Sequence, residues 1–237
     1  MQRPNVRVVT WNIAFGIEID AAIAELRANE SLCDADIWLL QEMDGAGTAT
    51  IAEALGVDHV YGGGELHQQT GREFGNAILT RWPLRPLDEL PLPGVAALSG
   101  HPRAATRAIV DVGGRDVLTY SVHTETAAMR LPRRVEQFRA VAKDTVSRTP
   151  SGPTQRVIIG GDFNTVTERG VRALSATMAE AALHRASTLA GPSFQRLGRR
   201  IPLDHVFVRA LTAIDAGVCW RATASDHMPM WVELEMP

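Results

Sequence analysis

Short apolar runs recur along the chain, and several of them end directly in polar residues. Residues 6–9, 37–40 and 157–159 consist mostly of valine, isoleucine and leucine. Runs of this length and composition are typical of strands that are buried on both faces. The pattern predicts strands at residues 6–12, 36–41, 74–81, 106–112, 117–123, 157–161, 203–208, 211–218 and 230–234.

Apolar residues at helical spacing lie between these strands. They predict helices at residues 20–29, 48–55, 131–148 and 169–178. Stretches rich in glycine and proline predict loops at residues 61–72, 90–103, 147–154 and 190–201. Strands and helices that alternate in this irregular way favour an α/β (α+β) fold, in which two stacked sheets are flanked by helices.

The composition is that of an ordinary globular domain. The chain has 237 residues, of which 45% are hydrophobic and 22% charged. This size suits one domain over residues 1–237 with a core large enough to need no disulfides. Cys33 and Cys219 lie in no metal-binding or redox spacing, which favours a reduced, cytoplasmic protein. A net charge of −3 argues against general binding of polyanions.

Neither a membrane span nor a secretory signal is expected from the sequence. Residues 1–5 lead directly into the first predicted strand, and no apolar run approaches the length that crosses a bilayer. Nothing in the pattern indicates an obligate protein partner.

Acids, amides and a histidine close or follow three of the predicted strands and precede the last one. Asn12 closes the first strand and Glu42 the second, Asp162 and Asn164 follow residues 157–161, and Asp226-His227 comes shortly before residues 230–234. A carboxylate can hold a divalent cation, another can position water, and Asn and His can donate hydrogen bonds to phosphate oxygens. The strand ends therefore predict metal-assisted phosphate chemistry.

Further segments extend this pattern in a fixed order. Phe74-Gly75-Asn76-Ala77-Ile78-Leu79-Thr80-Arg81, Ser121-Val122-His123-Thr124 and Pro202-Leu203-Asp204-His205-Val206-Phe207 complete the set. Together, from Thr10 to His227, the chain resembles the endonuclease/exonuclease/phosphatase superfamily, whose members share the deoxyribonuclease I-like fold. The resemblance implies a four-layer α/β/β/α sandwich of two mixed sheets flanked by helices.

The resemblance also implies roles for individual residues. It implies a Mg²⁺ or Mn²⁺ site, catalytic groups, and two residues near the substrate phosphate. Bland interpretations stay open for several of them, because Asp and Asn form turns and a histidine at a strand end is often structural. The implied metal ligands are Glu42, Asp226 and Asn12; the catalytic residues are His123, Asp162, Asn164, Asp204 and His227; the phosphate contacts are Arg103 and Asn76.

Within this set Asp204 is expected to orient His227, and His205 to point away from the site, since neighbouring residues on a strand face opposite sides. No motif places the acid that partners His123, and Glu73 is one candidate for it.

The expected activity is hydrolysis of phosphodiester bonds by in-line attack of water, most simply in a nuclease. A phosphatase or phosphodiesterase for a lipid or small phosphorylated molecule is the alternative, and a binding module without activity is a third. The expected partner is thus a nucleic acid or another phosphoester. A nucleic acid requires basic contacts to its backbone, for which the first candidates are Arg103, Arg130, Arg133 and Arg134.

Overall fold

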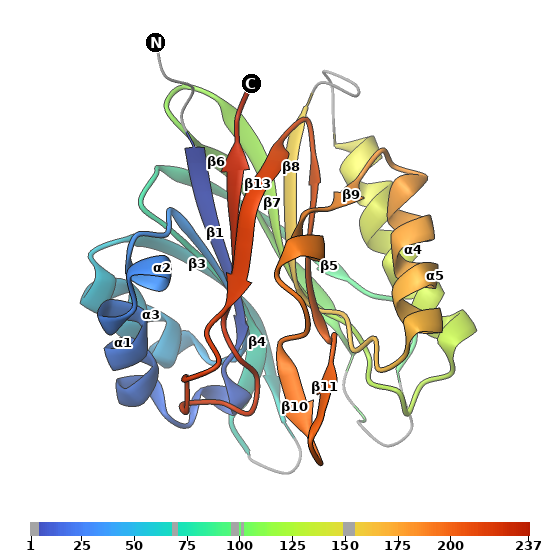
Figure 1. Cartoon of the computed structure of the whole chain (residues 1–237), viewed down its shortest axis with the longest axis horizontal. Helices are drawn as coiled ribbons and strands as arrows, with labels where there is room; N and C mark the ends of the chain where they lie inside the picture. The colour runs from blue at the N-terminus through green and yellow to red at the C-terminus, as the bar shows by residue number, and fades with distance from the viewer. Residues whose placement is uncertain (1–4, 68–70, 96–99, 101, 149–154) are drawn as a thin grey trace.

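Two stacked sheets form the centre of the molecule (Figure 1). The computed structural model describes residues 5–67, 71–95, 100, 102–148 and 155–237. Within these residues the first sheet has the strand order β13 (Thr212–Val218), β14 (Met230–Glu235), β1 (Asn5–Asn12), β2 (Ile37–Met43), β4 (Glu73–Thr80), β3 (Asp58–Leu66). The second has the order β5 (Leu84–Pro91), β6 (Ala104–Asp111), β7 (Asp116–His123), β8 (Arg156–Asp162), β12 (Asp204–Arg209), β9 (His184–Arg185).

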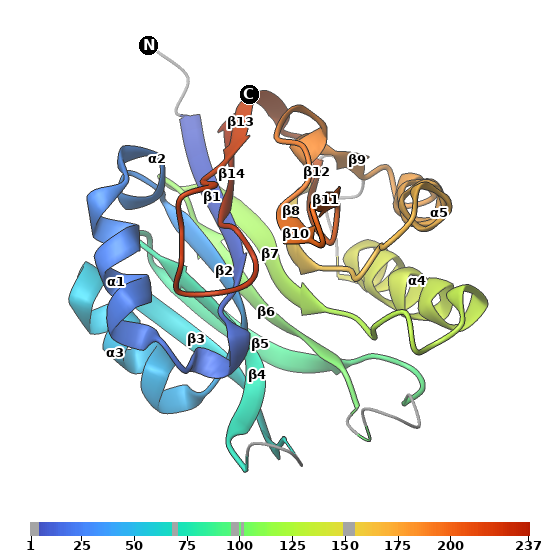
Figure 2. The same ribbon diagram turned by 60° about the horizontal axis from the view of Figure 1, so that its bottom comes forward.

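Helices cover the outer face of each sheet, which gives the four-layer sandwich expected from the sequence (Figures 1 and 2). The blue helices α1 (Ile19–Ala28), α2 (Glu30–Cys33) and α3 (Gly45–Leu55) lie on the first sheet. The helices α4 (Leu131–Ser147) and α5 (Glu168–Ala179) lie on the second. Two short 3₁₀ helices, η1 (Ala14–Gly16) and η3 (Ala186–Leu189), and a small hairpin of β10 (Phe194–Arg196) and β11 (Arg199–Ile201) complete the described elements.

Three apolar layers separate these four layers, and the strand sequences explain them. In β1, Val8 packs between the sheets with Leu39 and Ile158, whereas Val9 packs toward the helices with Leu26. Alternation along a strand sends neighbouring side chains to opposite faces, so a strand with apolar residues on both faces must be covered twice. A third layer joins the second sheet to α4 and α5 around Phe138.

The four predicted helices are confirmed, but three predicted loops contain strands. β3 overlaps residues 61–72, β5 extends into residues 90–103, and β10 and β11 fill much of residues 190–201. β5 is an edge strand with Pro86 and several exposed positions, and such strands carry a weak apolar signal.

The glycines of β3 hide that strand in the sequence for a different reason. A Cβ added at Gly75 would lie 2.1 Å from the carbonyl oxygen of Gly62, and one at Gly63 would lie 2.8 Å from the Cα of Gly75. Glycine is required at this close approach between β3 and β4, where the pairing register shifts.

In the described part of the chain, no helix has the length and apolar character needed to cross a membrane.

Candidate active site

The predicted site residues converge because strands of both sheets end at the same edge of the sandwich. β1 and β2 are parallel and pair Asn12 with Gln41, while β7 and β8 are parallel and pair His123 with Asp162. β12 runs antiparallel to β8, so its first residue, Asp204, lies opposite Asp162. Residues as far apart in sequence as Asn12 and Asp204 thus meet in the space between the two sheets.

A β-bulge turns Glu42 toward this space. The register between β2 and β4 shifts between Gln41 and Met43, and Glu42 adopts the left-handed conformation with φ of 57°. A bulge redirects a side chain in this way at the cost of a ladder hydrogen bond. The Nδ2 atom of Asn12 donates to Glu42 Oε1 at 3.1 Å. Burial raises the pKa of Glu42 despite this bond, and repulsion from Asp226 contributes to the same direction.

Asp162 lies at the centre of the cluster. The same amide of Asn12 donates to its Oδ2 at 3.1 Å, and the backbone N–H of Asn164 donates to its Oδ1 at 2.8 Å. The Nε2 atoms of His123 and His227 lie 3.6 and 3.7 Å from Asp162 Oδ2. Burial raises the pKa of Asp162 above its ordinary value, and the neighbouring Asp204 carboxylate acts in the same direction.

His227 and Asp204 form a buried pair. The Nδ1 atom of His227 lies 2.8 Å from Asp204 Oδ2, which leaves Nε2 directed toward Asp162. Burial opposes the imidazolium charge, but Asp204 and then Asp162 outweigh it and raise the pKa of His227 well above 6.5. His227 is therefore the imidazolium, with both ring nitrogens protonated, at neutral pH.

His123 is neutral, and Arg103 fixes its tautomer. Burial lowers the pKa of His123 well below 6.5, and the charges of Arg103 and His227 lower it further. Arg103 Nη1 lies 3.2 Å from His123 Nδ1. Because a guanidinium only donates, Nδ1 accepts and the imidazole proton lies on Nε2, which faces Asp162. Arg103 itself is 7% exposed and lies 3.6 Å from Glu125, so it stands behind His123.

Asn164 combines a turn with a place in the site. Its φ is 51°, and its bond to Asp162 closes the Asx turn that the sequence left open. The Nδ2 atom of Asn164 donates to the backbone carbonyl of Thr124 at 3.1 Å. Arg134 donates to the backbone carbonyl of Asn164 at 2.6 Å.

The remaining predicted residues lie around this cluster. Asp226 is exposed beside His227, while Asn76 is buried in β4 and donates to the carbonyl of Ala104. Among the described residues, Glu73 forms no contact with His123; its carboxylate accepts from the backbone N–H of Gly45. The acids nearest to His123 Nε2 are instead Asp162 and, at 3.9 Å, Glu42.

Sequence reasoning missed three supporting residues. Ser193 donates to Asp204 Oδ2, Phe194 places its ring 4.8 Å from that of His227, and Glu125 backs Arg103. Ser193 and Phe194 fall in the stretch taken as a loop, where no motif distinguishes them. Glu125 lies two residues after His123, and only its complete burial in the structure distinguishes it from an ordinary surface acid.

Two groups of oxygen and nitrogen atoms could hold a cation. Ligand atoms of Asp162, Asp204 and His227 lie within 4.8 Å of one another in the described residues. Asp204 accepts from His227 and from Ser193 through Oδ2, whereas its buried Oδ1 has no hydrogen-bond partner among the described residues. The Glu42 carboxylate, flanked by the Asn12 amide and the charge of Asp226, forms the second group of hard oxygen ligands.

His205 lies on the opposite face of β12, where it packs against Phe163 and Phe207 and its Nε2 lies 2.7 Å from Thr165 Oγ1. Burial lowers its pKa from 6.5 to about 4. Between these values the unfolded chain binds more protons, so the free energy of unfolding should fall as pH drops from about 6.5 toward 4. We expect His205 to account for about 3 kcal/mol of this loss at most.

Denaturant titrations of wild type and His205→Asn across this pH range measure the effect. The variant should show a shallower acid loss of stability than the wild type. Parallel curves would contradict the assignment of a neutral, buried imidazole.

The fold and the site define a class of protein, and comparison with known families identifies it. The model of the endonuclease/exonuclease/phosphatase family matches residues 9–227, so the chain belongs to this family. Among curated proteins, a UPF0294 protein of Yersinia pseudotuberculosis is 30% identical over 122 residues, which are 52% of this chain and 44% of that protein. The matched segment thus spans less than half of that relative.

Solved structures share the fold over nearly the whole chain. An endonuclease/exonuclease/phosphatase of Beutenbergia cavernae has a TM-score of 0.79 at 22% identity, covering 99% of this chain and 72% of that one. Humanized D. rerio TDP2 has a TM-score of 0.75 at 16% identity, covering 98% and 99%. A mannosyl-6-phosphatase of Bacteroides thetaiotaomicron has a TM-score of 0.71 at 18% identity, covering 97% and 99%.

Proposed function

We propose that the protein is a divalent-metal-dependent phosphoesterase that hydrolyses its substrate by direct attack of water on phosphorus. The observation that carries this proposal is the buried position of Asp162 between two imidazoles and one amide, with Glu42 bound to the same amide. Membership of the endonuclease/exonuclease/phosphatase family supports the same class of reaction. A binding module without activity would have no need for these buried, mutually repelling acids.

The protonation states suggest how the side chains divide the work. The raised pKa of Asp162 makes it a stronger base than an exposed carboxylate, suited to accept a proton from the attacking water. His227 holds a proton at Nε2 and is suited to donate to a phosphoryl or leaving oxygen. His123 offers a second donor without adding charge.

Mg²⁺ or Mn²⁺ fits the acids at the end of β2. Carboxylate and amide oxygens are the ligands that these hard cations prefer, and a cation would relieve the repulsion between Glu42 and Asp226. In this proposal Glu42, Asp226 and Asn12 hold the cation. When bound, it would polarise the phosphoryl group and neutralise part of its charge.

We favour a small phosphorylated molecule as the substrate. The sequence alone favoured a nucleic acid and left a small phosphorylated molecule as the alternative. The arginines proposed to bind a nucleic acid are mostly engaged: Arg134 holds Asn164 and is buried, Arg103 stands behind His123, and Arg133 lies 3.0 Å from Glu136. A pocket of about 290 Å³ opens beside His123 instead, and this volume suits a compact leaving group.

A nucleic acid stays the second candidate because of the β10–β11 hairpin. Its exposed Arg196 and Arg199 lie opposite each other across this hairpin, whose first residue, Phe194, packs on His227. Proteins that share the fold are also of different kinds: one is a TDP2, and another is a mannosyl-6-phosphatase.

The test is a substrate panel in Mg²⁺, in Mn²⁺ and in chelator, with bis(4-nitrophenyl) phosphate, hexose phosphates, duplex DNA and RNA. We expect metal-dependent hydrolysis of at least one phosphoester, and its loss in Asp162→Asn prepared in parallel. Hydrolysis that survives both the chelator and Asp162→Asn would be a contaminant, and an absence of hydrolysis throughout would overturn the proposal. If DNA or RNA is cleaved, the rate should fall steeply across a salt series.

A further inference from the structure

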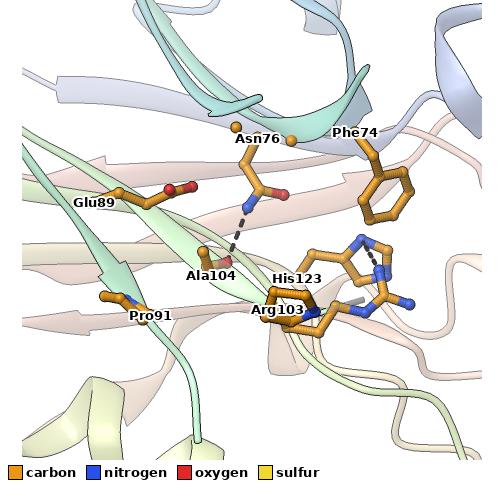
Figure 3. Close-up of a pocket in the computed structure, with 10 residues that line it drawn as sticks. Phe74, Asn76, Glu89, Pro91, Arg103, Ala104 and His123 are labelled. Carbon is orange, nitrogen blue, oxygen red and sulfur yellow. Dashed lines mark hydrogen bonds between the residues drawn. The ribbon is translucent and has the colours of Figure 1, made fainter. Parts of the chain in front are cut away.

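Apart from His123 itself, the residues that form the pocket beside it have no proposed part in holding a cation or a catalytic proton. Its walls come from β4, β5, the start of β6 and the segment before it, with His123 at one end (Figure 3). The lining residues are Gly63, Phe74, Gly75, Asn76, Glu89, Pro91, Pro102, Arg103, Ala104 and His123. Because His123 belongs both to this pocket and to the proposed catalytic cluster, a group leaving the phosphorus would enter this pocket.

One wall carries an unused hydrogen-bond acceptor. Asn76 is 4% exposed, and its Nδ2 donates to the carbonyl of Ala104 at 2.9 Å. That bond fixes the orientation of the amide, since a carbonyl can only accept. Asn76 Oδ1 is consequently the atom turned away from Ala104; it is buried and has no hydrogen-bond partner among the described residues, and Figure 3 shows it turned toward Phe74 and His123. A buried amide oxygen without a partner is costly, so the pocket calls for a donor.

Glu89 adds a second acceptor near the mouth of the pocket. The pairing of β5 with β6 shifts between Leu87 and Leu90, and Figure 3 shows the Glu89 carboxylate on the Asn76 side of the pocket. Arg103 forms part of the opposite wall, with its guanidinium 4.9 Å from the centre of the Phe74 ring. This fixed positive charge disfavours a cationic amine, so the donors that suit Asn76 and Glu89 are neutral hydroxyl groups.

A nucleobase suits the pocket less well than a hydroxylated group does. Base recognition relies on an open aromatic face. Phe74 is already surrounded by Arg103, by His123 at 5.5 Å, by His67 at 5.4 Å and by Phe15 at 5.7 Å between ring centres. Together with Pro91 and Pro102, it offers apolar edges against which the C–H groups of a sugar ring can pack.

From this combination we infer that the pocket selects a neutral, hydroxyl-rich leaving group of the size of a monosaccharide, with Asn76 and Glu89 accepting its hydroxyl protons. This inference rests on the proposed phosphoesterase function. The substrate class it names is a sugar or polyol phosphate.

The experiment compares two esters of primary alcohols of similar size and reactivity. One is a set of hexose 6-phosphates (glucose, mannose and galactose), and the other is cyclohexylmethyl phosphate, which lacks hydroxyls. The readout is the ratio of kcat/KM for the best hexose phosphate to that for cyclohexylmethyl phosphate. We expect a ratio of about 10²-fold, because a site built to bond hydroxyls rejects an analogue without them.

Two variants test the two acceptors separately. Asn76→Ala should lower the ratio about 10-fold, and Glu89→Gln several-fold, because each hydroxyl loses an acceptor. Asp88→Asn is the matched control: it changes the neighbouring acid on β5, which lies outside the pocket lining, and should keep the wild-type ratio. If Asn76→Ala unfolds, the kcat/KM ratio of Glu89→Gln still tests the inference, because residue 89 is exposed.

The outcomes separate this inference from the proposed function. A wild-type ratio near one, or a ratio unchanged in Glu89→Gln and in folded Asn76→Ala, overturns the inference; in the second case water alone satisfies Asn76. Hydrolysis of bis(4-nitrophenyl) phosphate without hydrolysis of either ester also overturns it and leaves the phosphoesterase standing. An absence of hydrolysis for every ester and metal overturns the proposed function itself.

Discussion

Glu42→Gln is expected to abolish metal-dependent turnover while leaving the fold intact. The carboxylate lies at a bulge that directs it into the site, where it accepts a hydrogen bond from Asn12. An amide oxygen carries no full charge and binds a hard cation much more weakly than a carboxylate does. Since a cation held by this carboxylate would contribute several kcal/mol to stabilising the transition state, turnover should fall on the order of 10³-fold.

Calorimetric titration with Mg²⁺ and Mn²⁺, beside steady-state kinetics, measures both effects. Glu136→Gln is the matched control, because this exposed acid of α4 pairs with Arg133 away from the site. Wild-type affinity for the cation in folded Glu42→Gln would show that another set of residues holds it, with Asp162, Asp204 and His227 next in line.

Asp204→Asn is expected to lower kcat by 10²- to 10⁴-fold, on the order found when the acid behind a catalytic histidine is neutralised elsewhere. Asp204 orients His227 through its bond to Nδ1 and stabilises the imidazolium charge. Without that charge, burial dominates and the pKa of His227 falls. Because the proposed role requires protonated His227, the alkaline limb of the pH–rate profile should move to lower pH.

His205→Asn serves as the control for this experiment, since His205 is the next residue along β12 but packs on the other face. It should change kcat little at neutral pH, under conditions where both variants remain folded. Equal losses of kcat in the two variants, or an unchanged pH profile in Asp204→Asn, would contradict the role given to Asp204.

The class of fold could be predicted from the sequence because its main strands are buried on both faces. Val8 and Val9 contact different layers, and the apolar run records both contacts in consecutive residues. The sequences of β5 and of the β10–β11 hairpin contain no such continuous apolar run. They are short or lie at an edge, so solvent covers much of their surface and polar residues are tolerated there.

The candidate site was predictable in its members but not in its geometry. Local sequence places Asn12, Asp162 and Asp204 at strand ends, and the parallel and antiparallel pairings then bring them together. No pattern in the sequence predicts that Arg103 bonds to His123. Their contact depends on how the segment before β6 packs beside β7, which local propensity does not determine.

By itself, the sequence determined the buried strands, the acids and histidines at their ends, and the family to which they belong. Only the tertiary structure decided the protonation of His227 and His123, the inward orientation of Arg103 and Arg134, and the pocket lined by Asn76 and Glu89. Apolar periodicity is a property of neighbouring residues. A pKa, an unpartnered amide oxygen or a cavity depends on groups brought together from distant parts of the chain.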